Sequence, residues 1–371
     1  MSKLIVLGDL HFGMRRNSKT FHDILTRELE ASFNHIKKTD TVIILGDVFD
    51  SRSSVDFKIL NDAWNFFIKL SRSCKEVYIL AGNHDEYYKD VSKENTNCRF
   101  LEFEPGSDSK ISPVKVITEL SEIKLNNKSC LFIPWIDNID RKNAAKKALG
   151  GKFDIILGHF DLVGIYSNGP APSDLLAFEV SDFPKDTLIL SGHYHKRVCK
   201  ENITYVGAFI NSTFNDVDDI KGLYTIDKNK KLDFIENGSP KFHYINIDNP
   251  SNFVKAYQLA DEKTKESINK KISGNFIKIF LNEYRKENDE VYKIIKSMNP
   301  IDVTVAFNRV SFENEDNITD FEGFDSKTDI AIVLTQYIDS IKDKLPEEVT
   351  VESVKWLINK KSLEFKQSLL T

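Results

Sequence analysis

The chain has 371 residues, of which 41% are hydrophobic and 29% are charged, and its formal net charge is −5. This composition is typical of a soluble globular protein with enough apolar material for two domains and a small appendage. The acidic balance argues against a simple DNA-coating protein, but it leaves room for a nuclease that binds DNA through a local basic groove.

Five short apolar runs, rich in β-branched residues, are predicted to be strands. In chain order they cover residues 4–9, 41–47, 76–83, 154–159 and 187–193. Helical patterns separate the first three runs. In the first pattern, helical spacing predicts that one face carries Phe21, Ile24, Leu25, Phe33 and Ile36. In the second, it predicts that one face carries Trp64, Phe67, Ile68 and Leu70. Strands that alternate with helices indicate an α/β core.

The second half of the chain has a different organisation. Residues 222–237 are predicted to form a hairpin that closes the first domain. A polar helix over roughly 251–272 then precedes a small β-α-β unit, and an acidic, Asn-rich linker leads to two amphipathic helices. The predicted segments are therefore a first domain at 1–245, an α+β domain at 246–311, a linker at 312–328 and a helical tail at 329–371.

The cysteines and the lack of long apolar runs indicate the cellular compartment that we expect for this chain. The four cysteines are scattered without a C-x-x-C pair, so neither a disulfide framework nor a structural zinc site is expected. The first residues run directly into KLIVLGD, in which we recognise no signal peptide. No apolar stretch approaches the roughly 20 residues of a membrane span, so we expect a cytoplasmic protein with no membrane partner.

Potential metal ligands follow each of the five predicted strands. The carboxyl ends of strands in open α/β sheets are where ligands bind, and the glycine in each turn permits close approach of the backbone. The polar side chains in these turns are Asp9, His11, Asp47, Asp50, Asn83, His84, Asp85, His159, His193 and His195. Mixed carboxylate, amide and imidazole groups suit Mn²⁺, Fe²⁺ or Zn²⁺. Because they exceed what one ion needs, we expect two ions that share a carboxylate, an arrangement used for displacement at phosphorus.

The blocks GDLH, GDVFD, GNHD, GHF and GHYH, in this order, resemble the five signature blocks of the calcineurin-like metallophosphoesterases. The resemblance implies a layered α-β-β-α core. It implies that one metal ion is held by Asp9, His11, Asp47 and His195. It implies that the other is held by Asp47, Asn83, His159 and His193, with Asp47 bridging. His84 would then protonate the leaving oxygen, and Asp50 would orient it, with Asp85 as the less favoured alternative.

The surrounding sequence is similar to SbcD-type DNA repair nucleases, and within them to the phage-encoded branch. GDVFDSR and GNHDEYYK differ from the DRG and GNHE of protein Ser/Thr phosphatases, whereas GDLHFGM, IPW at 133–135, GHFDLVG and SGHYHKR resemble the repair nucleases. This resemblance implies a homodimeric DNA nuclease that prefers Mn²⁺, with Mg²⁺ as a substitute, and carries a DNA-capping second domain. Since the chain has no Gly-rich nucleotide-binding loop, ATP dependence would come from an SbcC-type coiled-coil ATPase.

Candidate contacts to DNA and to the ATPase carry competing interpretations. Basic side chains beside the metal-binding turns are candidates for DNA phosphates or are ordinary solvated charge, namely Arg15, Arg16, Arg52 and Lys89. The tail helices either fold back onto the chain or dock the ATPase through apolar residues that include Ile338, Ile341, Trp356 and Leu357.

Three functions are compatible with these observations. The first is a metal-dependent DNA nuclease of recombination and double-strand-break repair that acts with the ATPase. The second is a metallophosphodiesterase for a small substrate, which would not need the extra domain and the tail. The third is a non-catalytic adaptor with the same fold. This function is disfavoured because every ligand position carries a residue that can bind a metal ion.

Overall fold

The computed structural model describes residues 2–86, 96–104, 110–165, 175–282 and 287–307. The predicted linker and helical tail lie outside these residues. So do Lys89 and the four tail residues proposed to contact the ATPase.

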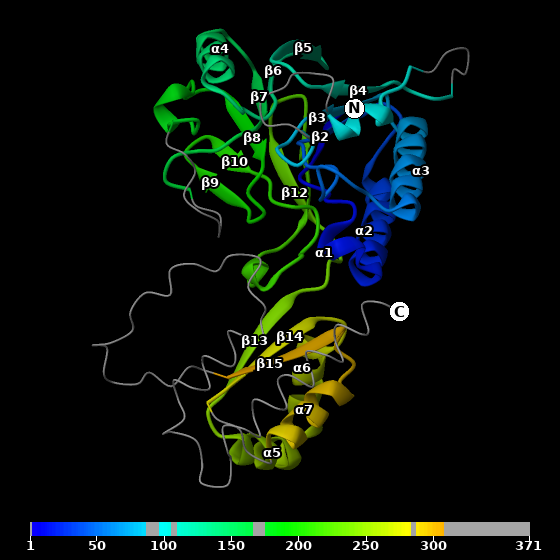
Figure 1. Cartoon of the computed structure of the whole chain (residues 1–371), viewed down its shortest axis with the longest axis vertical. Helices are drawn as coiled ribbons and strands as arrows, with labels where there is room; N and C mark the ends of the chain where they lie inside the picture. The colour runs from blue at the N-terminus through cyan, green and yellow to red at the C-terminus, as the bar shows by residue number, and fades with distance from the viewer. Residues whose placement is uncertain (1, 87–95, 105–109, 166–174, 283–286, 308–371) are drawn as a thin grey trace, which may run out of the picture. The chain divides into compact units, whose positions relative to one another are not determined.

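A six-stranded sheet forms the first half of the core, in the order β12-β11-β1-β2-β3-β4. Its strands are β1 (Leu4–Leu7), β2 (Thr41–Ile44), β3 (Glu76–Leu80), β4 (Val114–Ile117), β11 (Gly222–Ile226) and β12 (Leu232–Glu236). The first four are parallel, and the predicted hairpin β11–β12 adds antiparallel to β1. Beside this sheet lie α1 (Met14–Asn17), α2 (Lys19–Ser32) and α3 (Phe57–Ser73) (Figure 1).

A second six-stranded sheet has the order β5-β6-β7-β8-β10-β9. Its strands are β5 (Ser121–Leu125), β6 (Lys128–Ile133), β7 (Ile155–His159), β8 (Leu188–Gly192), β9 (Val198–Lys200) and β10 (Ile203–Tyr205). Strands β6, β7, β8 and β10 run parallel, with antiparallel strands at both edges. Helix α4 (Ile139–Leu149) packs its Ala145 and Leu149 against the face of this sheet that carries Ile156.

The two sheets pack face to face, which gives the α-β-β-α layering. Along β1, Leu4 and Val6 join a buried cluster with Phe132 and Leu157 of the second sheet. Ile5 and Leu7 point the other way, into the cluster beneath α2 and α3. Because both faces of β1 are covered, the strand is apolar throughout, as is typical of buried parallel sheets. The predicted α/β class and layered core are confirmed.

Helix α3 differs from its predicted orientation. Asp56 caps it by accepting a hydrogen bond from the Lys58 N–H at 2.8 Å. The buried stripe is formed by Ile59, Ala63, Phe67 and Leu70. The prediction that Trp64 lies on the buried face is wrong, because Trp64 is 36% exposed and lies one position past this stripe. Its indole instead stacks on the Phe100 ring, with centroids 6.4 Å apart.

The β-α-β unit predicted after the first domain is present as a three-stranded parallel sheet. It contains β13 (Phe242–Ile247), β14 (Phe276–Leu281) and β15 (Asp302–Phe307). Its helices are α5 (Pro250–Leu259), α6 (Glu262–Ile272) and α7 (Glu287–Ser297). The polar helix predicted over 251–272 is two helices, since Asp261 interrupts it and caps α6. Strand β13 spans the predicted domain boundary at residue 245.

The described residues also contain short 3₁₀ turns, at η1 (Phe33–His35), η3 (Asn97–Leu101), η4 (Val180–Asp182) and η5 (Phe214–Asp216). Within the described ranges, none of the helices combines the length and the apolar character that crossing a membrane requires.

Candidate metal centre

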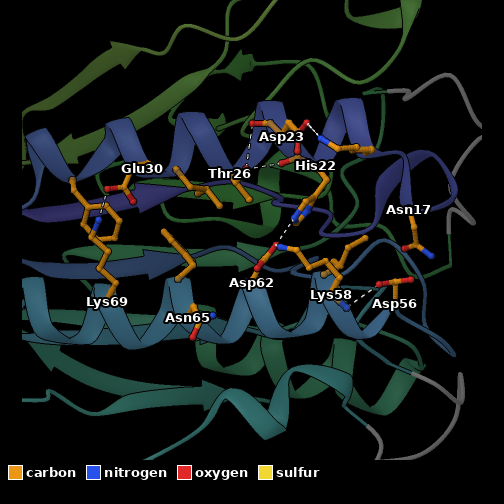
Figure 2. Close-up of a pocket in the computed structure, with 15 residues that line it drawn as sticks. Asn17, His22, Asp23, Thr26, Glu30, Asp56, Lys58, Asp62, Asn65 and Lys69 are labelled. Atoms are coloured by element: carbon orange, nitrogen blue, oxygen red, sulfur yellow. Dashed lines mark hydrogen bonds and ion pairs between the residues drawn. The ribbon is translucent and has the colours of Figure 1, made fainter.

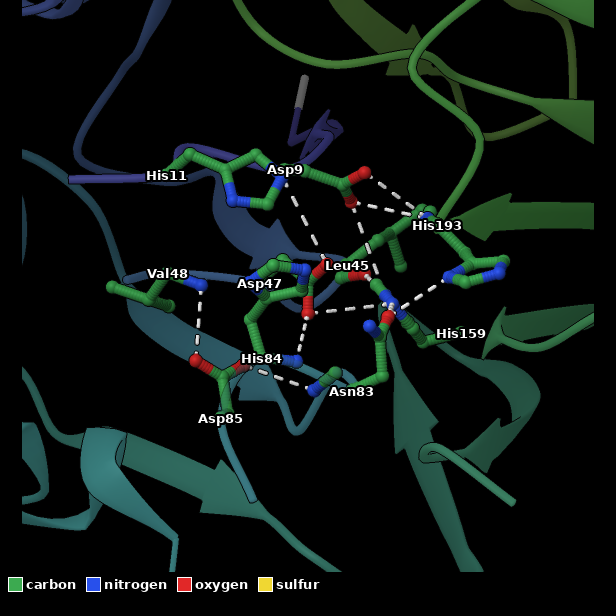
Figure 3. Close-up of polar contacts among 12 residues, drawn as sticks. Asp9, His11, Leu45, Asp47, Val48, Asn83, His84, Asp85, His159 and His193 are labelled. Carbon is green, nitrogen blue, oxygen red and sulfur yellow. Dashed lines mark hydrogen bonds and ion pairs between the residues drawn. The ribbon is translucent and has the colours of Figure 1, made fainter. Parts of the chain in front are cut away.

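Five strand ends from the two sheets meet at one place. Asp9 and His11 follow β1, Asp47 follows β2, and the turn after β3 carries Asn83 and His84. From the second sheet, His159 ends β7, and the turn after β8 carries His193 and His195. Figure 3 shows side chains from both sheets directed toward a common centre. The parallel strands explain this convergence, because their carboxyl ends lie at one edge of each sheet.

The backbone of these turns is strained and tightly packed. His11, Asp47 and His193 have φ values of 48°, 49° and 87°, a region that costs about 1–3 kcal/mol for residues other than glycine. A Cβ atom on Gly192 would lie 2.2 Å from the Leu45 carbonyl oxygen and 2.5 Å from an Asp9 carboxylate oxygen. Glycine is therefore required at this position, and the tight packing of the turns imposes the strained φ values of the polar residues.

Asp9, His11 and His195 form the first group of potential ligands, whose atoms lie within 4.8 Å of one another. The Nε2 atoms of His11 and His195 are 3.0 Å apart. The Asp9 carboxylate accepts a hydrogen bond from the His193 N–H at 3.1 Å, which fixes its orientation. The His11 Nδ1 atom is buried and has no hydrogen-bond partner. One nitrogen from each histidine and one Asp9 oxygen are therefore close enough together to be ligands of one cation.

The second group consists of Asp47, His159 and His193, together with Asn83. His159 donates from Nδ1 to the Leu45 carbonyl at 2.6 Å, which leaves the Nε2 lone pair facing the Asn83 Oδ1 atom at 3.0 Å. His193 donates from Nε2 to Asp161 at 2.9 Å, so its Nδ1 atom faces the same Oδ1 atom at 2.9 Å.

The protonation pattern of this second group fits a divalent cation. With both imidazoles neutral, Asn83 Oδ1 and the two facing ring nitrogens are all acceptors, and no proton lies between them. A cation satisfies all three at once.

Asp47 lies between the two groups. Its Oδ2 atom is 3.8 Å from His11 Nε2, and its Oδ1 atom is 3.5 Å from His159 Nε2. The Oδ1 atom also accepts a hydrogen bond from the His84 backbone N–H at 2.8 Å. Each carboxylate oxygen therefore faces a different group, which is the geometry that a bridging ligand needs.

Burial and mutual charge set the protonation states of the centre. Burial lowers the pKa of His159 to about 4, and burial with the neighbouring His195 lowers the pKa of His11 well below its usual range. Burial opposes ionisation of Asp47, but His159, His11 and His84 together lower the pKa of its carboxyl. The imidazoles of His159 and His11 are thus neutral near neutral pH, and the neutral ring is the form that binds metal ions.

His84 is oriented by a different atom from the one expected. Its Nδ1 atom donates to the backbone carbonyl of Asp50 at 2.5 Å. The Asp50 carboxylate instead lies 3.5 Å from His11 Nδ1. Asp85 is fully buried and accepts hydrogen bonds from the N–H groups of Gly82 and Val48, so it ties the second and third turns together.

Sequence reasoning missed residues that support the histidines. Asp161 accepts hydrogen bonds from the His193 ring at 2.9 Å and from the Tyr194 hydroxyl at 3.1 Å. The Trp135 ring lies 4.9 Å from the ring of His193 and 6.0 Å from that of His159. The position of Asp161, two residues after the ligand His159, could have predicted this role. Metal-binding imidazoles commonly donate their second N–H to a carboxylate.

A cavity of about 540 Å³ opens onto the centre. It is lined by Asp47, Asn83, His84, Ile165, His193, Tyr194, His195, Lys196, Val198, Thr213, Asn215 and Asp216. A somewhat larger cavity, of about 610 Å³, lies between α2 and α3 (Figure 2). There the charged groups pair with one another, as in the contacts of Asp62 with His22 and Lys58. Because the smaller cavity exposes converging ligands, we assign the site to it.

The basic residues predicted to contact DNA differ in their surroundings. Arg15 and Arg16 are exposed and have φ values of 56° in a left-handed turn shortly after the first ligand turn. Arg15 donates from Nε to the Ser212 carbonyl at 2.9 Å, which ties this turn to the segment that carries Thr213. Arg52 is half-buried.

Comparison with known proteins adds two findings. A sequence model of the calcineurin-like phosphoesterases matches residues 2–197, which is more than half of the chain and includes all five ligand turns. Exonuclease subunit 1 of Enterobacteria phage T4 is 24% identical over 254 residues, covering 65% of this chain and 70% of that protein.

Proposed function

The chain belongs to the calcineurin-like phosphoesterase family, and on this premise we propose that it is a two-metal-dependent DNA nuclease. As a member of this family it is a metal-dependent phosphoesterase. The observation that carries the proposal is the Asp47 carboxylate, whose two oxygens face two separate groups of potential ligands. The phage relative is named an exonuclease subunit, which supports a nucleic-acid substrate for this chain.

The ligand assignment follows the geometry and the family resemblance together. We assign one ion to Asp9, His11, Asp47 and His195. We assign the other to Asp47, Asn83, His159 and His193. When bound, such a pair of divalent ions stabilises the charge of the phosphoryl group and activates the attacking water. The mixed nitrogen and oxygen donors support Mn²⁺ as the preferred ion, with Mg²⁺ as a substitute.

His84 is the proposed general acid. Its Nδ1–H is held by the Asp50 carbonyl. In the doubly protonated ring, the proton on Nε2 is then the one available to the leaving oxygen in the cavity that His84 lines, and its transfer leaves a neutral imidazole. Exposed Arg15 and Arg16 are proposed to contact DNA phosphates, together with Arg52 and Lys89. The strained left-handed turn supports this role for the first two, because such strain is commonly stored at functional sites.

Further proposals concern the assembly. The sheet and helices of 246–311 are proposed to cap the DNA. The helices of 329–371 are proposed to dock an SbcC-type ATPase in a homodimeric repair complex in the cytoplasm of a bacterial host. Truncation after Asp325 should then leave metal-dependent cleavage intact and abolish co-purification with the ATPase. Unchanged binding of the ATPase by the truncated protein would exclude the tail as the docking site.

A nuclease assay tests the central proposal. Labelled single- and double-stranded DNA is incubated with the full chain and Mn²⁺, with and without the ATPase, alongside the variants Asp47→Asn and His193→Ala. We expect cleavage by the wild type and none above background by either variant. Near-normal turnover by either variant would contradict the two-metal assignment. Hydrolysis of a nitrophenyl phosphodiester without any cleavage of DNA would instead support the small-substrate alternative.

A further inference from the structure

Lys221 is a buried cation beside the metal centre that the proposed chemistry does not use. The residue is 2% exposed, and its Nζ atom donates to three acceptors. These are the His195 backbone carbonyl at 2.6 Å, Asp219 Oδ2 at 2.8 Å and Asp216 Oδ1 at 3.1 Å. A buried ammonium group is tolerated only with this kind of complete pairing, so the three contacts form one structural unit.

The three acceptors belong to two segments that border the cavity. Asp216 accepts hydrogen bonds through Oδ2 from the N–H groups of Ser212 and Thr213, both at 2.9 Å, and this segment lines the cavity. Asp219 also accepts from the Arg197 N–H at 3.3 Å. Lys221 therefore joins the turn that contains His195 to the segment that forms the adjacent wall.

We propose that Lys221 is a positioning residue for the metal ligand His195. The His195 carbonyl accepts from Lys221 and from the Ala208 N–H at 3.0 Å, while its ring lies 3.0 Å from His11 across the first group of ligands. Two donors on one carbonyl fix the backbone from which the imidazole projects. The inference rests on the proposed metal centre and adds a residue that acts on only one of its two ions.

The expected effect is selective for one ion. Loss of an outer partner of a metal ligand typically lowers metal affinity about 10–100-fold. In Lys221→Met we expect a loss of this size for the ion served by His195. The ion served by Asn83, His159 and His193 should bind as in the wild type. Isothermal titration of the metal-free full chain with Mn²⁺ measures both affinities, and phosphodiester hydrolysis should recover as the Mn²⁺ concentration is raised.

Lys128→Met is the matched control. Lys128 is also buried, at 8% exposed, and donates to a backbone carbonyl, that of Lys228 at 2.6 Å. It lies at the start of β6, at the opposite end of the sheet from the ligand turns. This variant should lose stability without a selective loss of one Mn²⁺ ion.

A second variant separates positioning from the cost of uncompensated buried charge. Lys221→Met removes the ion-pair partner of Asp216 and leaves Asp219 with Arg197 alone, 3.6 Å away. The triple variant with Asp216→Asn and Asp219→Asn removes the three charges together and should fold more stably than Lys221→Met. We expect the triple variant still to bind weakly the Mn²⁺ ion that His195 serves. Two wild-type affinities for Mn²⁺ in either variant, or equal losses at both sites in the folded triple variant, would overturn the proposal. Because Mn²⁺ binding is measured without DNA, a failure of the nuclease proposal would leave this result interpretable.

Discussion

Replacing His84 with alanine should slow cleavage of DNA without weakening metal binding. His84 donates its backbone N–H to the proposed ligand Asp47, and alanine retains this hydrogen bond. Its ring meets that of the proposed ligand His11 edge-on, with centroids 5.0 Å apart, and holds no hydrogen bond to it. The side chain contributes the ring nitrogen left free by the Asp50 carbonyl. Removing a general acid typically costs about 10²–10⁴-fold in rate. At about 1.36 kcal/mol per tenfold, this is roughly 2.7–5.4 kcal/mol of lost transition-state stabilisation.

The assay compares two substrates with the same enzyme. DNA has a poor leaving group that needs a proton, whereas a nitrophenyl phosphodiester has a good one that does not. His84→Ala should therefore lose far more activity on DNA than on the nitrophenyl ester, at unchanged Mn²⁺ affinity. The control is His243→Ala, which replaces a half-buried histidine of β13. This variant should match the activity of the wild type on both substrates. Equal losses on the two substrates, or weaker Mn²⁺ binding, would refute the role of proton donor.

Three further predictions address the surroundings of the centre. Asp161→Asn should weaken Mn²⁺ binding about 10–100-fold, since it removes the carboxylate that orients His193, and unchanged affinity in a titration would contradict this. Gly192→Ala should destabilise the fold by about 1–3 kcal/mol in denaturant unfolding, whereas Gly150→Ala, whose Cβ would meet its nearest atom at 3.3 Å, should not. At neutral pH, maleimide should label exposed Cys199 and spare the three buried cysteines, whose pKa values are raised by burial; labelling of all four in the folded chain would show that the core opens.

Local sequence was sufficient for the strands that carry the potential ligands and for the turns that follow them, but β4, β5, β6, β9 and β10 were not predicted. An apolar run, a glycine and a polar residue are adjacent in the chain, so β1 with Asp9 and β2 with Asp47 could be predicted from short segments alone. The identities of the side chains also limited the chemistry, because mixed imidazole, amide and carboxylate groups suit a divalent metal. For these features the relevant physical interactions act within a few residues.

Tertiary structure alone decided which atoms meet. The choice of the Asp50 carbonyl over its carboxylate as the partner of His84 depends on how two turns 34 residues apart pack together. The same holds for Lys221, whose ammonium reaches a carbonyl 26 residues away, and for Trp64, whose outward position follows from the rotation of α3 about its axis. A sequence pattern records which groups are available, but the second hydrogen bond of a histidine and the pairing of a buried charge are set by the packing of distant segments, which periodicity and spacing do not encode.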